Sequence, residues 1–168
     1  MKNISFGLLI LILLLMSSSC RKSDETKEIK QLIDRYVSVW NGDALNKLDN
    51  IAAKNFQLRI VPEFAASMGI QKLKAEITQT RNYFPDFELT ETERIFTGDT
   101  AVVIRWTATG TFKNRNQMSP SAGKINVPGF SVIFFTNGKL TGEWIAYSDL
   151  TWYKQLGFTL KPPEKPAT

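Results

Sequence analysis

The chain has 168 residues and a mild basic excess, with 21 Lys and Arg against 16 Asp and Glu and a formal net charge of +5 at pH 7. It has no histidine and a single cysteine, which excludes catalytic triads and zinc sites built on imidazole. The basic residues form no stripe interleaved with aromatic side chains, so nucleic acid is not an expected partner.

The first predicted element is a short apolar segment that ends at the only cysteine. Lys2 gives it a basic start, residues 6–16 are apolar with Gly7 as the one interruption, and three serines precede Cys20. A short apolar segment with a basic front and small residues at its end is typical of a secretory signal rather than of a membrane-spanning helix. We therefore predict a signal peptide over residues 1–19.

The position of Cys20 resembles the lipobox of bacterial lipoproteins, in which this thiol is acylated and becomes the mature N-terminus. Ser17 departs from the pattern, because a lipobox usually carries Leu three residues before the cysteine. An ordinary signal peptide with an incidental cysteine is the alternative. The resemblance implies a protein of the bacterial cell envelope, on its periplasmic or surface face, held to the membrane by a lipid anchor with residues 20–26 as the tether.

Three helices are predicted next. The first, residues 29–40, has apolar side chains at three- and four-residue spacing and ends at an Asn-Gly pair. Asp43 can cap a second, short helix that ends at Ile51. The third covers residues 70–83 and ends before a proline. A brief strand, residues 56–61, lies between the second and third helices.

From residue 87 onward the pattern predicts β-structure. Four segments rich in β-branched and aromatic residues predict long strands, over residues 87–96, 101–112, 125–135 and 140–147. Gly98-Asp99 and Asn137-Gly138 are typical hairpin turns between them. Pro128 cannot continue a regular ladder inside the third of these strands, which predicts a bulge or an edge position there. A short helix or turn is predicted over residues 152–156.

Helices followed by a meander of long strands predict an α+β domain. We expect three N-terminal helices packed on a bent, mostly antiparallel sheet. This single domain should cover residues 27–158, with a loose C-terminal tail over residues 159–168.

Several short motifs, in order, resemble the SnoaL-like polyketide cyclase or ester cyclase family. They include Trp40-Asn41-Gly42-Asp43, Phe84-Pro85-Asp86-Phe87, Gly110-Thr111, Gly138-Lys139, Glu143-Trp144, Asp149 and Gln155-Leu156-Gly157. Each motif alone is common, but their order and spacing together are specific. The resemblance implies the cone-shaped fold of the nuclear transport factor 2-like superfamily, which agrees with the predicted element order.

The resemblance also implies a catalytic residue. In polyketide cyclases of this family an Asp near the end of the last strand acts as general acid/base in an intramolecular aldol closure, and Asp149 is at the matching position. An apolar pocket would raise the pKa of such a carboxylate toward the working pH. Alternation along the last strand puts Glu143, Ile145 and Tyr147 on the same face as Asp149. The alternative is that Asp149 caps the turn that follows.

We expect a ligand pocket inside the cone, lined by Glu143, Ile145, Tyr147, Tyr36, Trp40, Arg59 and Trp106. Arg59 and Phe112 occupy positions where the family usually has His. Arg59 could bind a carboxylate or an oxyanion, and its alternative is a surface or salt-bridged position. For Tyr36, Trp40 and Trp106 the alternative is that they only fill the core.

Three hypotheses for the function follow. The first is a cofactor-free cyclase, isomerase or hydrolase acting on a small hydrophobic carbonyl compound; the second is a lipid-anchored protein that binds such a ligand without catalysis. The third is an interaction domain with a filled cone that forms a homodimer through its sheet. No glycine-rich phosphate loop and no calcium-type carboxylate loop is present, so we expect no cofactor and no metal.

Overall fold

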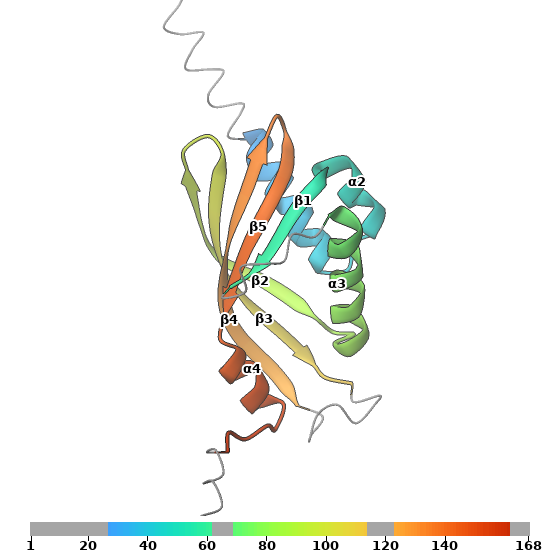
Figure 1. Ribbon diagram of the computed structural model, residues 1–168, viewed down its shortest axis with the longest axis vertical. Helices are drawn as coiled ribbons and strands as arrows, with labels where there is room; N and C mark the ends of the chain where they lie inside the picture. The colour runs from blue at the N-terminus through green and yellow to red at the C-terminus, as the bar shows by residue number, and fades with distance from the viewer. Residues whose placement is uncertain (1–26, 62–68, 114–122, 162–168) are drawn as a thin grey trace, which may run out of the picture.

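The computed structural model describes residues 27–61, 69–113 and 123–161 (Figure 1). Residues 27–40 form the first helix. The later elements are η1 (Leu45–Lys47), α2 (Leu48–Ile51), β1 (Ala52–Ile60), α3 (Ile70–Tyr83), β2 (Glu88–Thr97), β3 (Ala101–Thr111), β4 (Lys124–Thr136), β5 (Lys139–Tyr147) and α4 (Asp149–Gln155). The predicted signal peptide, Cys20 and the tether lie outside the described residues.

The strands form one five-stranded sheet in the order β1-β5-β4-β3-β2. Strands β2 to β5 make an antiparallel meander, whereas β1 pairs in parallel with β5, so the sheet is mixed. The first helix, α2 and α3 lie to one side of this sheet (Figure 1). The α+β class and the mostly antiparallel sheet therefore agree with the sequence prediction.

The helical layer differs in detail from the three predicted helices. The second helix is a 3-10 turn, η1, followed by the single turn of α2. Strand β1 then starts at Ala52, four residues earlier than predicted, directly after α2. The reason is that Ile51 and Ala52 are both buried, so the chain passes from helix to strand without leaving the core.

Strand β4 continues through Pro128 in unbroken register with β3. Its pairing with β5 reaches only as far as Gly129, opposite Tyr147, so Pro128 has an edge position on that side. Helix α4 covers the edge beyond it: the Gln155 side chain accepts from the Asn126 backbone N–H at 2.7 Å and donates to its carbonyl at 3.1 Å. The edge position predicted for Pro128 is therefore confirmed. The irregularity in the β4–β5 pairing lies elsewhere, between Phe134 and Phe135.

The core lies between the helices and the inner face of the sheet. Alternation along β3 buries Val102, Ile104 and Trp106, whereas Val103 between them points to the outer face. The first helix contributes the fully buried Ile33 and α3 contributes the fully buried Ile77, among others. Each such buried aliphatic side chain stabilises the fold by about 1.5–3 kcal/mol relative to an exposed one.

Candidate functional site

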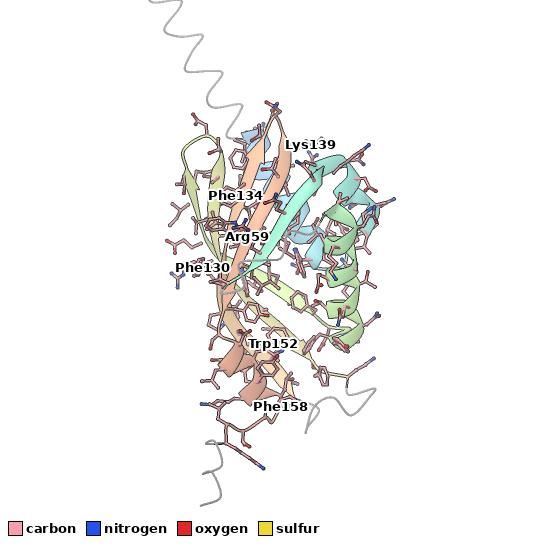
Figure 2. All side chains as sticks on the ribbon, viewed as in Figure 1. Arg59, Phe130, Phe134, Lys139, Trp152 and Phe158 are labelled. Carbon is pink, nitrogen blue, oxygen red and sulfur yellow. The ribbon has the colours of Figure 1, made fainter. Side chains whose placement is uncertain are left out.

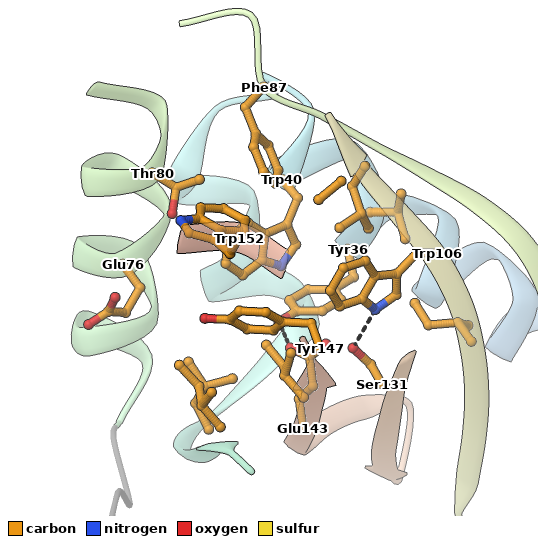
Figure 3. A pocket seen from close by; sticks show the side chains of 17 residues that line it. Tyr36, Trp40, Glu76, Thr80, Phe87, Trp106, Ser131, Glu143, Tyr147 and Trp152 are labelled. Atoms are coloured by element: carbon orange, nitrogen blue, oxygen red, sulfur yellow. Dashed lines mark hydrogen bonds between the residues drawn. The ribbon is translucent and has the colours of Figure 1, made fainter. Parts of the chain in front are cut away.

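A cavity opens between the inner face of the sheet and the helices. Its volume is about 160 Å³, which is enough for a ligand the size of a single aromatic ring. Its lining is mainly apolar and includes six aromatic side chains: Tyr36, Trp40, Phe87, Trp106, Tyr147 and Trp152. The polar lining residues are Glu76, Thr80, Ser131 and Glu143. Figure 3 shows how these side chains converge from the sheet and from the helices.

Glu143 is the buried carboxyl group of the cavity. Its position on β5 faces inward, and the residue is only 3% exposed. The Tyr36 hydroxyl, on the first helix, donates a hydrogen bond to Glu143 Oε2 at 2.5 Å. The Ser131 hydroxyl, on β4, is a second hydrogen-bond partner of the same carboxyl group. The first helix, which is distant in the sequence, and the neighbouring strands β4 and β5 therefore meet at Glu143.

Two indole rings orient these hydroxyl groups. Trp106 Nε1 donates to Ser131 Oγ at 2.9 Å, and the Trp40 side chain hydrogen-bonds to Tyr36. An indole N–H can only donate, so each hydroxyl accepts from a tryptophan and keeps its own proton for Glu143. The chain Trp40–Tyr36–Glu143–Ser131–Trp106 thus presents two donors to one carboxyl group.

The environment changes the acidity of both buried groups. Burial raises the pKa of Glu143, and the hydrogen bonds from Ser131 and Tyr36 oppose that rise without cancelling it. Burial, together with the negative charge of Glu143, raises the pKa of Tyr36 well above its ordinary value. Tyr36 therefore stays protonated, while Glu143 holds a proton more readily than an exposed glutamate does. A raised carboxyl pKa in an apolar cavity is typical of a general acid/base.

At the other end, which we call the mouth, the cavity is lined by partly exposed residues of α3, α4 and the end of β5: Glu76, Thr80, Trp152 and Tyr147. Tyr147 lies between Trp106 and Trp152, with ring centroids 6.4 Å and 5.7 Å away. Burial raises the pKa of Tyr147 to about 12, with further contributions from the carboxylates of Asp149 and Glu76. The Tyr147 hydroxyl is therefore neutral and lies in a negative surrounding.

Gly129 on β4 explains how the Trp106 ring reaches this site. The two residues are opposite each other in the β3–β4 pairing. A Cβ atom at position 129 would lie 2.3 Å from Trp106 Cη2, which is far inside van der Waals contact. Only glycine leaves room for the indole, and the indole then reaches Ser131.

Residues 30–156 match the family model of the SnoaL-like polyketide cyclases. The chain belongs to this family. None of the curated proteins matches the chain.

Solved structures support the SnoaL-like fold. A protein of Acidithiobacillus ferrooxidans is 24% identical, with a TM-score of 0.67, over 77% of this chain and 94% of its own. TsrD from Streptomyces laurentii is 21% identical, with a TM-score of 0.67, over 78% and 96%. A protein with a ketosteroid isomerase-like fold from Catenulispora acidiphila, solved in complex with trimethylamine, is 19% identical, with a TM-score of 0.64, over 78% and 97%.

Six of the predicted pocket residues line the cavity of this SnoaL-like domain. They are Tyr36, Trp40, Trp106, Glu143, Ile145 and Tyr147. Arg59 does not, and its predicted place in the pocket is wrong. Leu58 and Ile60 on either side of it line the cavity, so Arg59 faces the outer side of β1, where its guanidinium lies 5.7 Å from the Trp144 ring centroid.

Asp149 is also placed differently from the prediction. Strand β5 ends at Tyr147, so the alternation that faces Glu143 and Tyr147 inward does not extend to Asp149. Asp149 is instead the exposed first residue of α4, and it is not among the residues that line the cavity. The helix cap is Ser148, whose hydroxyl accepts from the Thr151 N–H at 3.2 Å. The link between Asp149 and the cavity is its interaction with the Tyr147 hydroxyl.

Sequence reasoning missed several residues of the site, chiefly Ser131, Glu76, Thr80 and Trp152. A signal for Ser131 was present, because it is the only hydroxyl at the inward positions of β4, which otherwise hold glycine or apolar side chains. Glu76 and Thr80 are one helical turn apart on α3, which puts both on the same side of that helix. Trp152 reaches the mouth through the position of α4, which no local pattern predicts.

Proposed function

We propose that this SnoaL-like protein binds a small, largely apolar carbonyl compound and that Glu143 is the general acid/base of a cofactor-independent cyclase or isomerase reaction. The observation that carries the proposal is the buried Glu143 carboxyl group, with its raised pKa, at the inner end of an apolar cavity. The match to the SnoaL-like polyketide cyclases supports the same reaction class.

In the proposed step, ionised Glu143 takes a proton from the carbon next to the carbonyl group. The C–H bond breaks, an O–H bond forms on Glu143, and the carbonyl oxygen becomes the negative oxygen of an enolate. Protonated Glu143 needs fewer donors, which frees the hydroxyl of Tyr36 or Ser131 to hydrogen-bond the enolate oxygen. Glu143 then returns the proton to the product. Such proton transfer contributes a rate increase of about 10²–10⁴-fold.

Asp149 is the second candidate for the acid/base. The family resemblance supports it, and its contact with Tyr147 gives it a route to the cavity. Glu143 is the stronger candidate, because Asp149 is exposed to solvent. An exposed carboxylate keeps its water shell, whereas a general base gains strength from desolvation.

The test is the exchange of α-protons for deuterium in an apolar ketone, 4-phenylbutan-2-one, followed by ¹H NMR in D₂O. We expect the wild type to accelerate exchange and Glu143→Gln to lose about 10²-fold or more of that acceleration. Glu88→Gln is the matched control, since Glu88 is exposed on β2 and outside the cavity lining. A comparable loss in Asp149→Asn with Glu143→Gln unaffected would transfer the role to Asp149. Binding of the ketone without exchange would leave a ligand-binding protein.

A non-catalytic homodimer is a second candidate function, favoured by the outer face of the sheet. Phe130 and Trp144 on this face are 47% and 46% exposed, and the Phe134 ring packs edge-on against Trp144 at 5.3 Å between ring centroids. Figure 2 labels Phe130 and Phe134. A second copy packed there would bury these rings. Sedimentation of the wild type and of Phe130→Ser tests it: a dimer that dissociates in the variant supports an interaction domain, and a monomeric wild type excludes it.

For localisation, we infer that Cys20 carries a lipid that anchors the protein to the cell envelope. The inference rests on the basic, apolar and small-residue order of residues 1–20. Among the described residues, no helix is long and apolar enough to cross a membrane.

A further inference from the structure

The cavity has an uneven charge balance. Its lining contains two carboxyl groups, Glu143 at the inner end and Glu76 on α3, and among the described residues no Lys or Arg lines it. None of the ion pairs between described residues involves either group. A carboxylate in an apolar surrounding is costly without a counter-charge, so this cavity favours a positively charged occupant over a negative one.

The walls of the mouth have the chemistry that binds organic cations. The faces of aromatic rings are negative, and they attract ammonium groups most strongly where water is excluded. Tyr147 and Trp152 supply two such rings, 5.7 Å apart between centroids, and Trp106 continues the aromatic wall inward from Tyr147. Purely apolar ligands would use these rings but would gain nothing from the carboxylates.

The negative charges of Glu76 and Asp149 act on Tyr147, one of these aromatic residues. In Figure 3, the Tyr147 hydroxyl points toward α3, the helix that carries Glu76. The charges of Asp149 and Glu76 both reach the Tyr147 hydroxyl, since both disfavour a negative charge there. A positive charge beside Tyr147 would be stabilised by the same two groups.

We infer that the mouth of the cavity, between Glu76, Tyr147 and Trp152, is a subsite for a protonated or quaternary amine. The inference rests on the proposed function for the other end of the ligand, where a carbonyl group would meet Glu143. The substrate class is then an amino ketone or a similar amine-bearing carbonyl compound, and acidic ligands are disfavoured.

The test compares choline with its uncharged isostere 3,3-dimethylbutan-1-ol by NMR titration of the full-length protein. We expect choline to bind about tenfold more tightly, because the two probes differ in charge and hardly in shape. Glu76→Gln should remove most of this preference without changing the affinity for the alcohol. Glu88→Gln, the control outside the cavity, should keep it. A parallel titration with 4-phenylbutan-2-one reports on the carbonyl site alone.

Each result separates the subsite from the proposed function. Equal or tighter binding of the alcohol, or a choline affinity that Glu76→Gln leaves unchanged, overturns the amine subsite. Binding of the ketone with no binding of choline overturns the subsite and leaves the proposed function standing. Binding of choline, sensitive to Glu76→Gln, with no binding of the ketone supports the subsite and overturns the carbonyl site. Absence of binding by all three probes overturns both.

Discussion

The Tyr36 hydroxyl donates to Glu143 Oε2 at 2.5 Å across 107 positions of sequence, and this bond joins the first helix to β5. Both residues are almost completely buried, at 1% and 3% exposure. The same bond therefore contributes to the attachment of the helix to the sheet and to the acidity of the group that we propose as the acid/base. Stability and function are therefore coupled through this hydrogen bond.

Tyr36→Phe should weaken the fold and make Glu143 less acidic. The substitution removes one of the two donors to a buried carboxyl group, which costs about 1–3 kcal/mol of unfolding free energy. The pKa of Glu143 should rise further, because the lost hydrogen bond lowers it in the wild type. Urea unfolding measures the first effect, and ¹³C NMR of the Glu143 carboxyl measures the second.

The control for Tyr36→Phe is Tyr153→Phe, since Tyr153 is 53% exposed and does not line the cavity. It should leave both the unfolding free energy and the Glu143 pKa unchanged. An equal loss of stability in the two variants would contradict the role assigned to the buried hydroxyl.

The contribution of Glu143 to stability should fall as the pH rises. Its pKa in the folded protein is raised above the ordinary value of 4.5, so between the two values the folded state binds more protons than the unfolded state. The stability of the wild type relative to Glu143→Gln should be greatest below pH 4.5 and should decline until the folded-state pKa is passed. Chemical unfolding of both proteins at a series of pH values measures the difference. A difference that grows with pH would contradict the raised pKa.

Gly129→Ala should displace Trp106. The new Cβ atom would lie 2.3 Å from the indole, so the ring must move and its hydrogen bond to Ser131 is lost. We expect a loss of about 1–3 kcal/mol of unfolding free energy, as for other overpacked core positions. Trp106→Leu in the Gly129→Ala background should recover part of it, and a double-mutant cycle quantifies the coupling. Strictly additive effects of the two substitutions would exclude the clash.

Cys20→Ala should release the protein from the membrane. If Cys20 is acylated, the wild type expressed in a Gram-negative host will be found in the membrane fraction and the variant in the soluble one. Mass spectrometry of the wild-type N-terminal peptide should show the acyl chains. Membrane fractionation that Cys20→Ala leaves unchanged, with no acyl mass in the wild type, would refute lipidation.

The sequence by itself determined the α+β class, the third helix, the four long strands and the family, because these depend on local periodicity, turn residues and ordered motifs. It also indicated Tyr36, Trp40, Trp106, Glu143, Ile145 and Tyr147. For Glu143, Ile145 and Tyr147 the reason is that alternation fixes which side chains of a strand face inward. Only the tertiary structure decided that the carboxyl group in the site is that of Glu143 and not that of Asp149. Asp149 falls just past the end of β5, and a strand's last residue depends on its neighbours in the sheet rather than on its own sequence. The two donors that meet at Glu143 come from the first helix and β4, and the packing of distant elements is what brings them together.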